Sequence, residues 1–195
     1  MKVKICGITS YKDAIESIKA GADALGFVFY NKSPRYLTPE DAAIIIKKLP
    51  PFVEKVALFV NATPEEVNRA CHTSGATLAQ LHFEVEPGFT KQLTHPFLHV
   101  VRAKSEADVL ENTTSYRLVD AYCEAYGGTG KRLNLEWFKN VDCSKIILAG
   151  GLTPENVNEV KAFGFYGVDI SSGVEARKGV KDSTKVQKFI KNAKS

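Results

Sequence analysis

The sequence has 195 residues, enough for one good-sized domain rather than two small ones. Its composition, 44% hydrophobic and 25% charged, is that of a globular protein and excludes a largely disordered chain. The net charge of +4 is small and dispersed, which suits a phosphorylated small molecule and excludes a typical nucleic-acid-binding surface.

Targeting signals and cysteines bear on where the protein works. The sequence begins without the apolar core of a signal peptide, and none of its apolar runs approaches the length of a membrane span. The four cysteines are too widely spaced for the framework of a small secreted protein. We therefore expect reduced thiols in a cytoplasmic protein with no membrane partner; the cysteines are Cys6, Cys71, Cys123 and Cys143.

Apolar strand-like runs alternate with helix-like segments along the chain. Most of the runs are apolar throughout, as strands buried on both faces should be. The predicted strands are 3–6, 24–30, 55–60, 78–82, 98–103, 116–120, 145–149 and 166–170. The predicted helices are 11–20, 39–49, 64–74, 105–112, 154–163 and 182–193, with a short or irregular helix within 84–94.

The tripeptide Thr-Pro-Glu occurs at 38–40, 63–65 and 153–155, each time just before a predicted helix. Threonine caps helix N-termini, proline fits the first helical turn, and glutamate there interacts favourably with the helix dipole. The same start at three junctions indicates one βα unit that is used repeatedly.

Eight strands in this length correspond to about 24 residues per βα unit, the smallest size for a closed barrel. An open doubly wound sheet is the alternative, but it normally carries Gly-x-Gly-x-x-Gly after its first strand, which Cys6-Gly7-Ile8-Thr9 does not match. No linker or low-complexity segment is present. We therefore predict an α/β protein, a compact (β/α)₈ TIM barrel with a single domain over residues 1–195.

In such a barrel, functional side chains lie where the strands end and the βα loops begin. Polar residues gather at these positions, in numbers that a packed core does not need. They are Cys6, Arg35, Asn61, Gln80, His82, Arg102, Asp120 and Asp169.

Two loops rich in small residues follow the last two predicted strands. Barrels often bind phosphate there through backbone N–H groups, and small residues let the anion approach closely. Either loop alone could be a plain turn, but together they predict a phosphate site. The loops are AGGLTPENV, which contains Gly150 and Gly151, and DISSGVEA, which contains Ser171, Ser172 and Gly173.

The segment YGGTGKR at 126–132 superficially resembles a P-loop. It lacks the first glycine of that motif and has arginine where serine or threonine should follow the lysine. Since it follows the sixth strand, we predict a mobile loop that closes over the site.

Three rim residues have both a structural and a functional interpretation. Cys6 reacts only as a thiolate, and exposure at a strand end would favour that form, whereas a lone cysteine is commonly a small buried hydrophobe. Asp120 is either a helix cap or a rim acid, because a carboxylate is costly to bury unpaired. His82 either faces the site or satisfies a hydrogen bond at the strand end.

Metal binding is not favoured. His95 and His99 have helical spacing, but Pro96 intervenes and an extended chain would place them too far apart for one zinc ion. No Cys-x-x-Cys occurs, so we expect no metal.

Eight segments, in order from residue 4 to residue 175, resemble phosphoribosylanthranilate isomerases. The resemblance implies a barrel free of metal and cofactors that acts in tryptophan biosynthesis. It would convert N-(5-phosphoribosyl)anthranilate into 1-(2-carboxyphenylamino)-1-deoxyribulose 5-phosphate, an Amadori rearrangement. The segments are KICGIT, GADALGFVF, SPRYLTPEDA, VALFVN, AQLH, YGGTGK, AGGLTPENV and VDISSGVE.

The resemblance also implies roles for individual residues. Cys6 would be the general base that takes the C2 proton, and Asp120 the general acid that protonates the ring oxygen. Arg35 would hold the anthranilate carboxylate. The remaining substrate-binding residues would be Asp169 at the sugar hydroxyls, Gln80 and His82 in AQLH, and Gly150, Gly151, Ser171, Ser172 and Gly173 at the phosphate. The family usually has glycine at Phe83 and lysine at Arg102.

Other phosphosugar barrels fit less well. An epimerase would need metal-binding histidines and a decarboxylase an Asp-x-Lys-x-x-Asp motif, and the sequence has neither. A non-catalytic phosphosugar-binding barrel is the remaining alternative, although binding alone needs neither Cys6 nor Asp120. The sequence leaves the oligomeric state open, a homodimer included.

Overall fold

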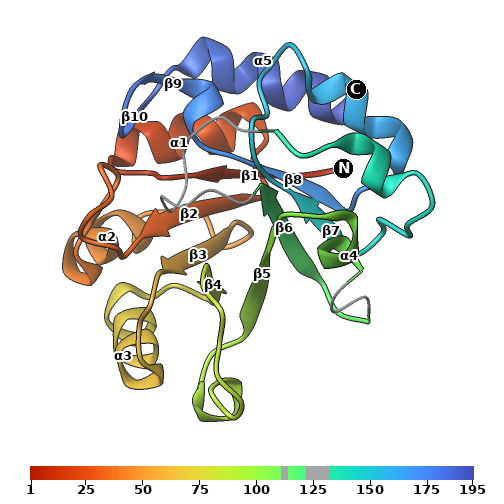
Figure 1. Cartoon of the computed structure of the whole chain (residues 1–195). Helices are drawn as coiled ribbons and strands as arrows, with labels where there is room; N and C mark the ends of the chain where they lie inside the picture. Colours follow the sequence, from red (N-terminus) through yellow and green to blue (C-terminus); the bar gives the residue numbers. More distant parts are fainter. Residues whose placement is uncertain (111–113, 122–131) are drawn as a thin grey trace.

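The computed structural model describes residues 1–110, 114–121 and 132–195. Within these ranges, eight parallel strands close into a barrel in chain order (Figure 1), which confirms the predicted fold class. Every predicted strand ends within two residues of an observed one. The strands are β1 Lys2–Cys6, β2 Ala24–Val28, β3 Glu54–Phe59, β4 Leu78–Leu81, β5 Phe97–Ala103, β6 Arg117–Ala121, β7 Ile146–Leu148 and β8 Gly167–Ile170.

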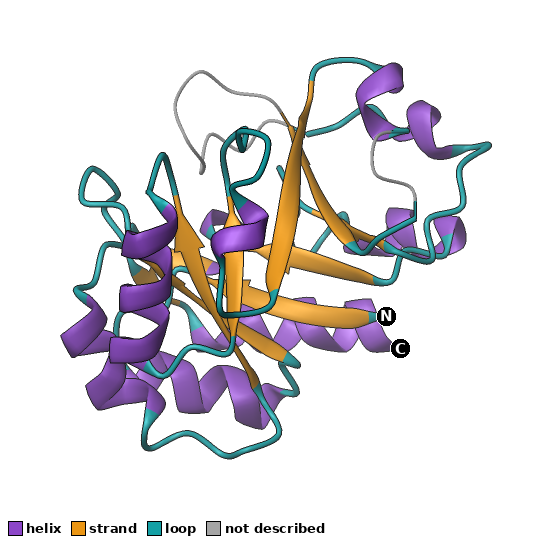
Figure 2. Cartoon of the chain, turned by 90° about the horizontal axis from the view of Figure 1, so that it is seen from below, coloured by secondary structure: helices purple, strands orange, loops and turns teal. Residues whose placement is uncertain are grey.

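The helices lie around the outside of the strands (Figure 2). Two of them, at 11–20 and 64–74, have the predicted bounds. The α-helices are α1 Tyr11–Ala20, α2 Pro39–Ile46, α3 Pro64–Ser74, α4 Glu106–Val109 and α5 Ser183–Lys194. The 3₁₀ helices are η1 Thr90–Gln92, η2 Leu135–Phe138, η3 Val157–Phe163 and η4 Ser172–Val174.

Three predicted helices differ from the observed ones. α2 ends three residues early, because Pro50 disfavours helical backbone at the residue before it. The helix predicted over 105–112 is short, and residues 111–113 lie outside the described ranges. The segment predicted at 154–163 is the 3₁₀ helix η3, since the Asn156 side chain bonds back to Thr153 N (2.8 Å) and Gly151 O (2.9 Å).

The repeated Thr-Pro-Glu start is confirmed at α2 and α3. Thr38 accepts a hydrogen bond from the Asp41 N–H, and Thr63 forms a reciprocal capping box with Glu66. Thr153 accepts from two N–H groups in the same way, although a 3₁₀ helix follows it. The tripeptide therefore sets the start of the segment and not its helix type.

The barrel has two apolar layers of unequal size. Val3 and Ile5 of β1 belong to the large cluster between the strands and the helices. The small cluster, Leu98, Leu118 and Ala149, packs with Leu78 and Ile147. Because side chains alternate along a strand, Lys4 and Cys6 of β1 face the other way, into the barrel. The barrel interior therefore combines a thin apolar layer with charged side chains.

A hairpin that the sequence did not indicate lies between β8 and α5. It pairs β9 Glu175–Arg177 with β10 Val180–Lys181 in antiparallel fashion. Its two strands have three and two residues and are mostly charged, so neither has the apolar pattern of a strand. The Lys181 N–H donates to Asp13 of α1 (3.2 Å), which fixes the hairpin against the barrel.

In the part of the chain that the structure describes, no helix combines the length and the apolar character needed to cross a bilayer.

The capping box at Thr63 provides a test of the helix-start analysis. Thr63→Ala should lower the free energy of unfolding by about 1 kcal/mol, because the Glu66 N–H loses its side-chain partner. Urea unfolding followed by circular dichroism measures this change. Thr63→Ser keeps the hydroxyl and should match the parent; an equal loss in both variants would contradict the capping explanation.

Candidate active site

The carboxyl ends of the strands carry the predicted site residues. Cys6 ends β1, His82 directly follows β4, Asp120 lies near the end of β6, and Asp169 lies in β8. Because all eight barrel strands are parallel, these ends share one rim. The structure groups the polar side chains there into three connected sets.

The first set surrounds Cys6. Lys4, two residues earlier on the same face of β1, is buried and its Nζ lies 2.9 Å from Asp169 Oδ1. The positive charge of Lys4 also acts on the Cys6 thiol and favours its ionised form. Among the described residues, neither apolar cluster includes Cys6. The buried thiol therefore lies beside charged groups of the barrel interior and outside the two apolar clusters.

The expected exposure of Cys6 is wrong. The residue is only 6% exposed, because β2 and the loops after β2 and β8 enclose it. Burial raises the pKa of the thiol, while the positive charges of Lys4 and Lys181 act in the opposite direction. The net result is a pKa above the ordinary value, so the neutral thiol dominates at neutral pH.

Glycines make the space that this first set needs. Gly26 pairs with Cys6 across β1 and β2, and a Cβ there would lie 2.8 Å from Cys6 Sγ and 3.1 Å from Lys4 Cε. Gly7 has φ +76°, and a Cβ there would lie 2.4 Å from Arg35 Cδ. The absence of a side chain at Gly7 therefore leaves the space that the Arg35 side chain occupies next to the Cys6-Gly7 turn.

The second set contains Asp120. His82 Nε2 lies 3.5 Å from Asp120 Oδ2, and Gln80 Nε2 lies 3.5 Å from His82 Nδ1. Burial, then the charge of Asp169, raises the pKa of Asp120 to about 6. Burial, then the charges of Arg102 and Lys4, lowers the pKa of His82 to about 4. A neutral imidazole therefore faces an aspartate that is partly protonated near neutral pH.

These contacts exclude the helix-cap alternative for Asp120 and place His82 beside it. Asp120 lies inside β6, so it is not a helix cap. His82 faces Asp120 from the strand end and is buried. Phe83, which follows it, packs edge-to-face on Phe89 at 5.6 Å between ring centroids and turns away from the rim into the large apolar cluster.

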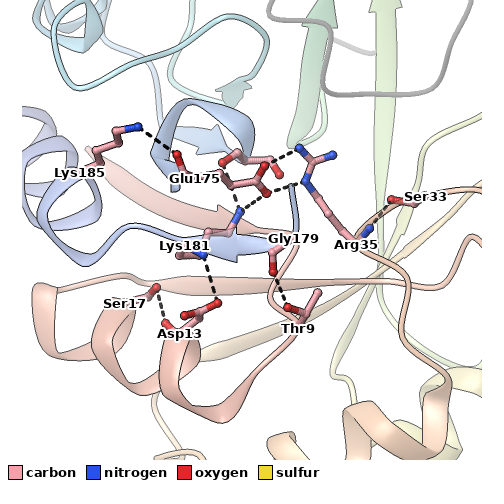
Figure 3. Close-up of polar contacts among 10 residues, drawn as sticks. Thr9, Asp13, Ser17, Ser33, Arg35, Glu175, Gly179, Lys181 and Lys185 are labelled. Atoms are coloured by element: carbon pink, nitrogen blue, oxygen red, sulfur yellow. Dashed lines mark hydrogen bonds and ion pairs between the residues drawn. The ribbon is translucent and has the colours of Figure 1, made fainter. Parts of the chain in front are cut away.

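The third set joins Arg35 to the hairpin (Figure 3). Arg35 Nε and Nη2 donate to the two oxygens of Glu175 at 2.7 and 2.8 Å, and Lys181 Nζ lies 3.0 Å from Glu175 Oε1. All three residues are buried. A guanidinium carries five N–H donors, so this fork uses two of them. Glu175 therefore fixes the plane in which Arg35 can meet a ligand.

Two buried polar atoms on the rim lack an internal partner. Among the described residues, nothing bonds to Gln80 Oε1 or Ser171 Oγ. An unsatisfied buried polar atom costs about 1–3 kcal/mol, so native proteins usually keep such atoms for a ligand or water. Both belong to the predicted substrate-binding residues.

The two glycine loops lie against each other. Gly150 and Gly151 have φ values of +88° and +62°, which favour glycine. A Cβ at Gly173 would lie 2.1 Å from the Leu152 carbonyl oxygen, so the loops after β7 and β8 are in direct contact. Ser172 and Gly173 open η4 on the second loop. The structure thus brings the predicted phosphate residues together.

The predicted closing loop lies mostly outside the described residues, as does Cys123. Of YGGTGKR only Arg132 is described, and its Nη2 lies 2.8 Å from Glu159 Oε2. Within the described ranges, no three His, Cys, Asp or Glu side chains are arranged to hold a metal ion.

Three charged residues at this rim were not predicted from the sequence: Lys4, Glu175 and Lys181. Lys4 carries a signal in hindsight, since a lysine interrupts an otherwise apolar buried strand. Glu175 and Lys181 carry none, because their burial depends on a hairpin too short to predict.

Comparison with known proteins identifies the family. Residues 3–192 match the family model described as N-(5'phosphoribosyl)anthranilate (PRA) isomerase. The chain belongs to that family. It is 62% identical over 195 residues to the N-(5'-phosphoribosyl)anthranilate isomerase of Sulfurovum sp. (strain NBC37-1), and the similarity covers 100% of both chains. The predicted family and enzyme class, an isomerase of tryptophan biosynthesis, are confirmed.

Solved structures agree with this assignment. One is a phosphoribosyl anthranilate isomerase in complex with reduced 1-(o-carboxyphenylamino)-1-deoxyribulose 5-phosphate, 38% identical with a TM-score of 0.85, covering 100% of this chain and 98% of that one. Another shows monomers of the dimeric isomerase from Thermotoga maritima, 36% identical with a TM-score of 0.85, covering 100% and 99%.

The Glu175 fork provides a stability test. Glu175→Gln should lower the free energy of unfolding by about 3 kcal/mol, because two buried cations lose their counter-charge. Glu155→Gln is the matched control: it removes the exposed partner of Lys188 and should change nothing measurable. Urea unfolding of both variants compares them, and similar losses would contradict the assigned role of burial.

Proposed function

We propose that this chain converts N-(5-phosphoribosyl)anthranilate into 1-(2-carboxyphenylamino)-1-deoxyribulose 5-phosphate with Cys6 as general base and Asp120 as general acid. The observation that carries the proposal is the placement of both groups on one rim, beside two touching glycine loops. Phosphosugar binding alone needs neither a buried thiol nor an aspartate with a raised pKa.

The chemistry needs one proton donor and one proton acceptor. Protonated Asp120 gives its proton to the ring oxygen as the C1–O bond breaks, and the nitrogen lone pair forms a C1=N bond. Cys6 thiolate then removes the C2 proton, and those electrons form C1=C2 as the nitrogen regains its lone pair. The resulting enol moves a proton from its C2 hydroxyl to C1 and gives the ketone. Each acid or base typically contributes about 10²–10⁴-fold.

The remaining residues bind the two charged ends of the substrate. In this proposal Arg35, held by Glu175, meets the anthranilate carboxylate with its remaining N–H groups. Gly150, Gly151 and the 171–173 segment receive the phosphate. Asp169, Gln80 and His82 contact the sugar. A similar solved structure holds a ligand with both a carboxyl group and a phosphate, which supports this division.

We also propose a cytoplasmic homodimer. The described cysteines are free thiols, which suits a reducing compartment. Phe52 is 98% exposed beside a depression of about 590 Å³ at the amino ends of the strands, lined by Phe97, Tyr116 and Tyr166 among others. A protruding aromatic side chain next to an aromatic depression suits reciprocal insertion between two copies. The similar T. maritima protein is described as dimeric.

Sedimentation velocity tests the dimer. The parent should sediment as a dimer at micromolar concentration, and Phe52→Glu as an active monomer, because a carboxylate is costly to bury among the aromatic side chains of the depression. Ile44→Glu, at another exposed apolar side chain, is the control and should stay dimeric. A monomeric parent would contradict the proposal.

The acid and base are tested by turnover. Cys6→Ser and Asp120→Asn should each lower kcat at least 100-fold. The assay follows anthranilate-type fluorescence on substrate generated in situ. Cys143→Ser, at a buried cysteine outside the site, should remain active. Near-normal turnover in Cys6→Ser would overturn the assignment of the base.

The two pKa values predict an unusual pH profile. The base must lose its proton at a pKa raised above that of an ordinary thiol, and the acid must keep its proton at a pKa of about 6. Because the acid has the lower pKa, the competent form is a minority whose fraction is constant between the two pKa values. We therefore expect kcat/KM to be flat from about pH 7 up to the ordinary pKa of a thiol, about 8.5. A tenfold change per pH unit in that range would contradict these pKa values.

A further inference from the structure

The inference concerns Lys4, which the roles above leave unused. Lys4 lies in the middle of β1, and its side chain is 6% exposed inside the barrel. A buried lysine loses several kcal/mol of hydration, and a well-packed apolar residue often serves stability as well as a buried ion pair does. A lysine at this position therefore calls for a role beyond holding β1 against β8.

The geometry places Lys4 and Cys6 in one small space. They face the barrel interior two residues apart, and Gly26 stands opposite Cys6 on β2. A single Cβ on Gly26 would meet both Cys6 Sγ and Lys4 Cε, at 2.8 and 3.1 Å. The ammonium end of Lys4 and the thiol therefore border the same gap, which glycine keeps open.

Charged groups from four elements act on Cys6. Lys4 is on β1, Asp169 on β8, Lys181 on β10 and Arg35 in the loop after β2. Both Arg35 and Lys181 bind Glu175, which offsets their charges. Among the described residues, Lys4 forms an ion pair with Asp169 alone. Its charge is the largest effect that opposes burial in setting the pKa of Cys6.

We propose that Lys4 is a positioning residue that stabilises the thiolate of Cys6 across the gap kept by Gly26. Asp169 holds the ammonium group in place and moderates its charge. This inference rests on the proposed role of Cys6 as the base. It assigns to Lys4 the task of making that base available in a buried site where a thiol alone would stay protonated.

The test uses two substitutions that break the same ion pair but leave opposite charges. Lys4→Met leaves the Asp169 carboxylate and should raise the apparent pKa of Cys6 by about one unit or more. Asp169→Asn leaves the Lys4 ammonium group and should lower it. The readout is the pH dependence of Cys6 alkylation by iodoacetamide in the free enzyme, followed by mass spectrometry of the Cys6 peptide.

Shifts in opposite directions support the proposal. No shift in Lys4→Met, or shifts of both variants in the same direction, would overturn it, since loss of structure alone acts alike on both. Lys2→Met, on the same face of β1 but exposed, is the control and should match the parent. Circular dichroism establishes that each variant is folded.

A double variant, compared with Asp169→Asn, covers the case in which Lys4→Met does not fold. Lys4→Met/Asp169→Asn buries no unpaired charge and differs from Asp169→Asn only at Lys4. Its Cys6 pKa should lie above that of Asp169→Asn, and equal values would overturn the proposal. Failure of the proposed function gives a different result, namely high turnover in Cys6→Ser.

Discussion

The ion pair between Lys4 and Asp169 is the interaction on which the rest of the site depends. It joins β1 to β8, the seam where the barrel closes, at 2.9 Å in a buried position. Lys4 acts on Cys6, and Asp169 acts on both Cys6 and Asp120. One buried pair therefore acts electrostatically on both Cys6 and Asp120, the proposed base and acid, although their strands lie on different sides of the barrel. The thin apolar layer at the other end of the interior leaves room for these charges.

Burial determines the chemistry of the rim as much as residue identity does. The thiol of Cys6 and the carboxyl group of Asp120 both have raised pKa values, mainly because water is excluded. His82 is kept neutral by the same cause, so it can exchange hydrogen bonds with Asp120 without adding a charge. On the other side of the thiol, Glu175 holds Arg35 and Lys181 in fixed positions. The rim thus combines cations and carboxylates that hold one another in place through buried ion pairs.

Much of the fold follows from local sequence. Helices α1 and α3 were predicted to the residue, because Ser10 and Thr63 cap their starts and Gly21 and Gly75 end them in left-handed backbone. The α-helix predicted over 154–163 was wrong in helix type: the structure has a 3₁₀ helix there, since the Asn156 side chain forms hydrogen bonds within its own loop. The expected exposure of Cys6 was also wrong, because the burial of this side chain depends on neighbours across the barrel. The Lys4–Asp169 pair joins residues 165 positions apart, and no local pattern could show it.

A crystal structure of this chain with reduced 1-(o-carboxyphenylamino)-1-deoxyribulose 5-phosphate would show which side chains contact the reacting atoms. We expect Cys6 Sγ in contact with the C2 carbon, within about 4 Å. We also expect a carboxyl oxygen of Asp120 at the oxygen that closes the ribose ring, Arg35 at the carboxyl group, and the phosphate on the 150–151 and 171–173 loops. A ligand whose phosphate lies elsewhere, or whose C2 is out of reach of Cys6, would contradict the assignment of base and acid.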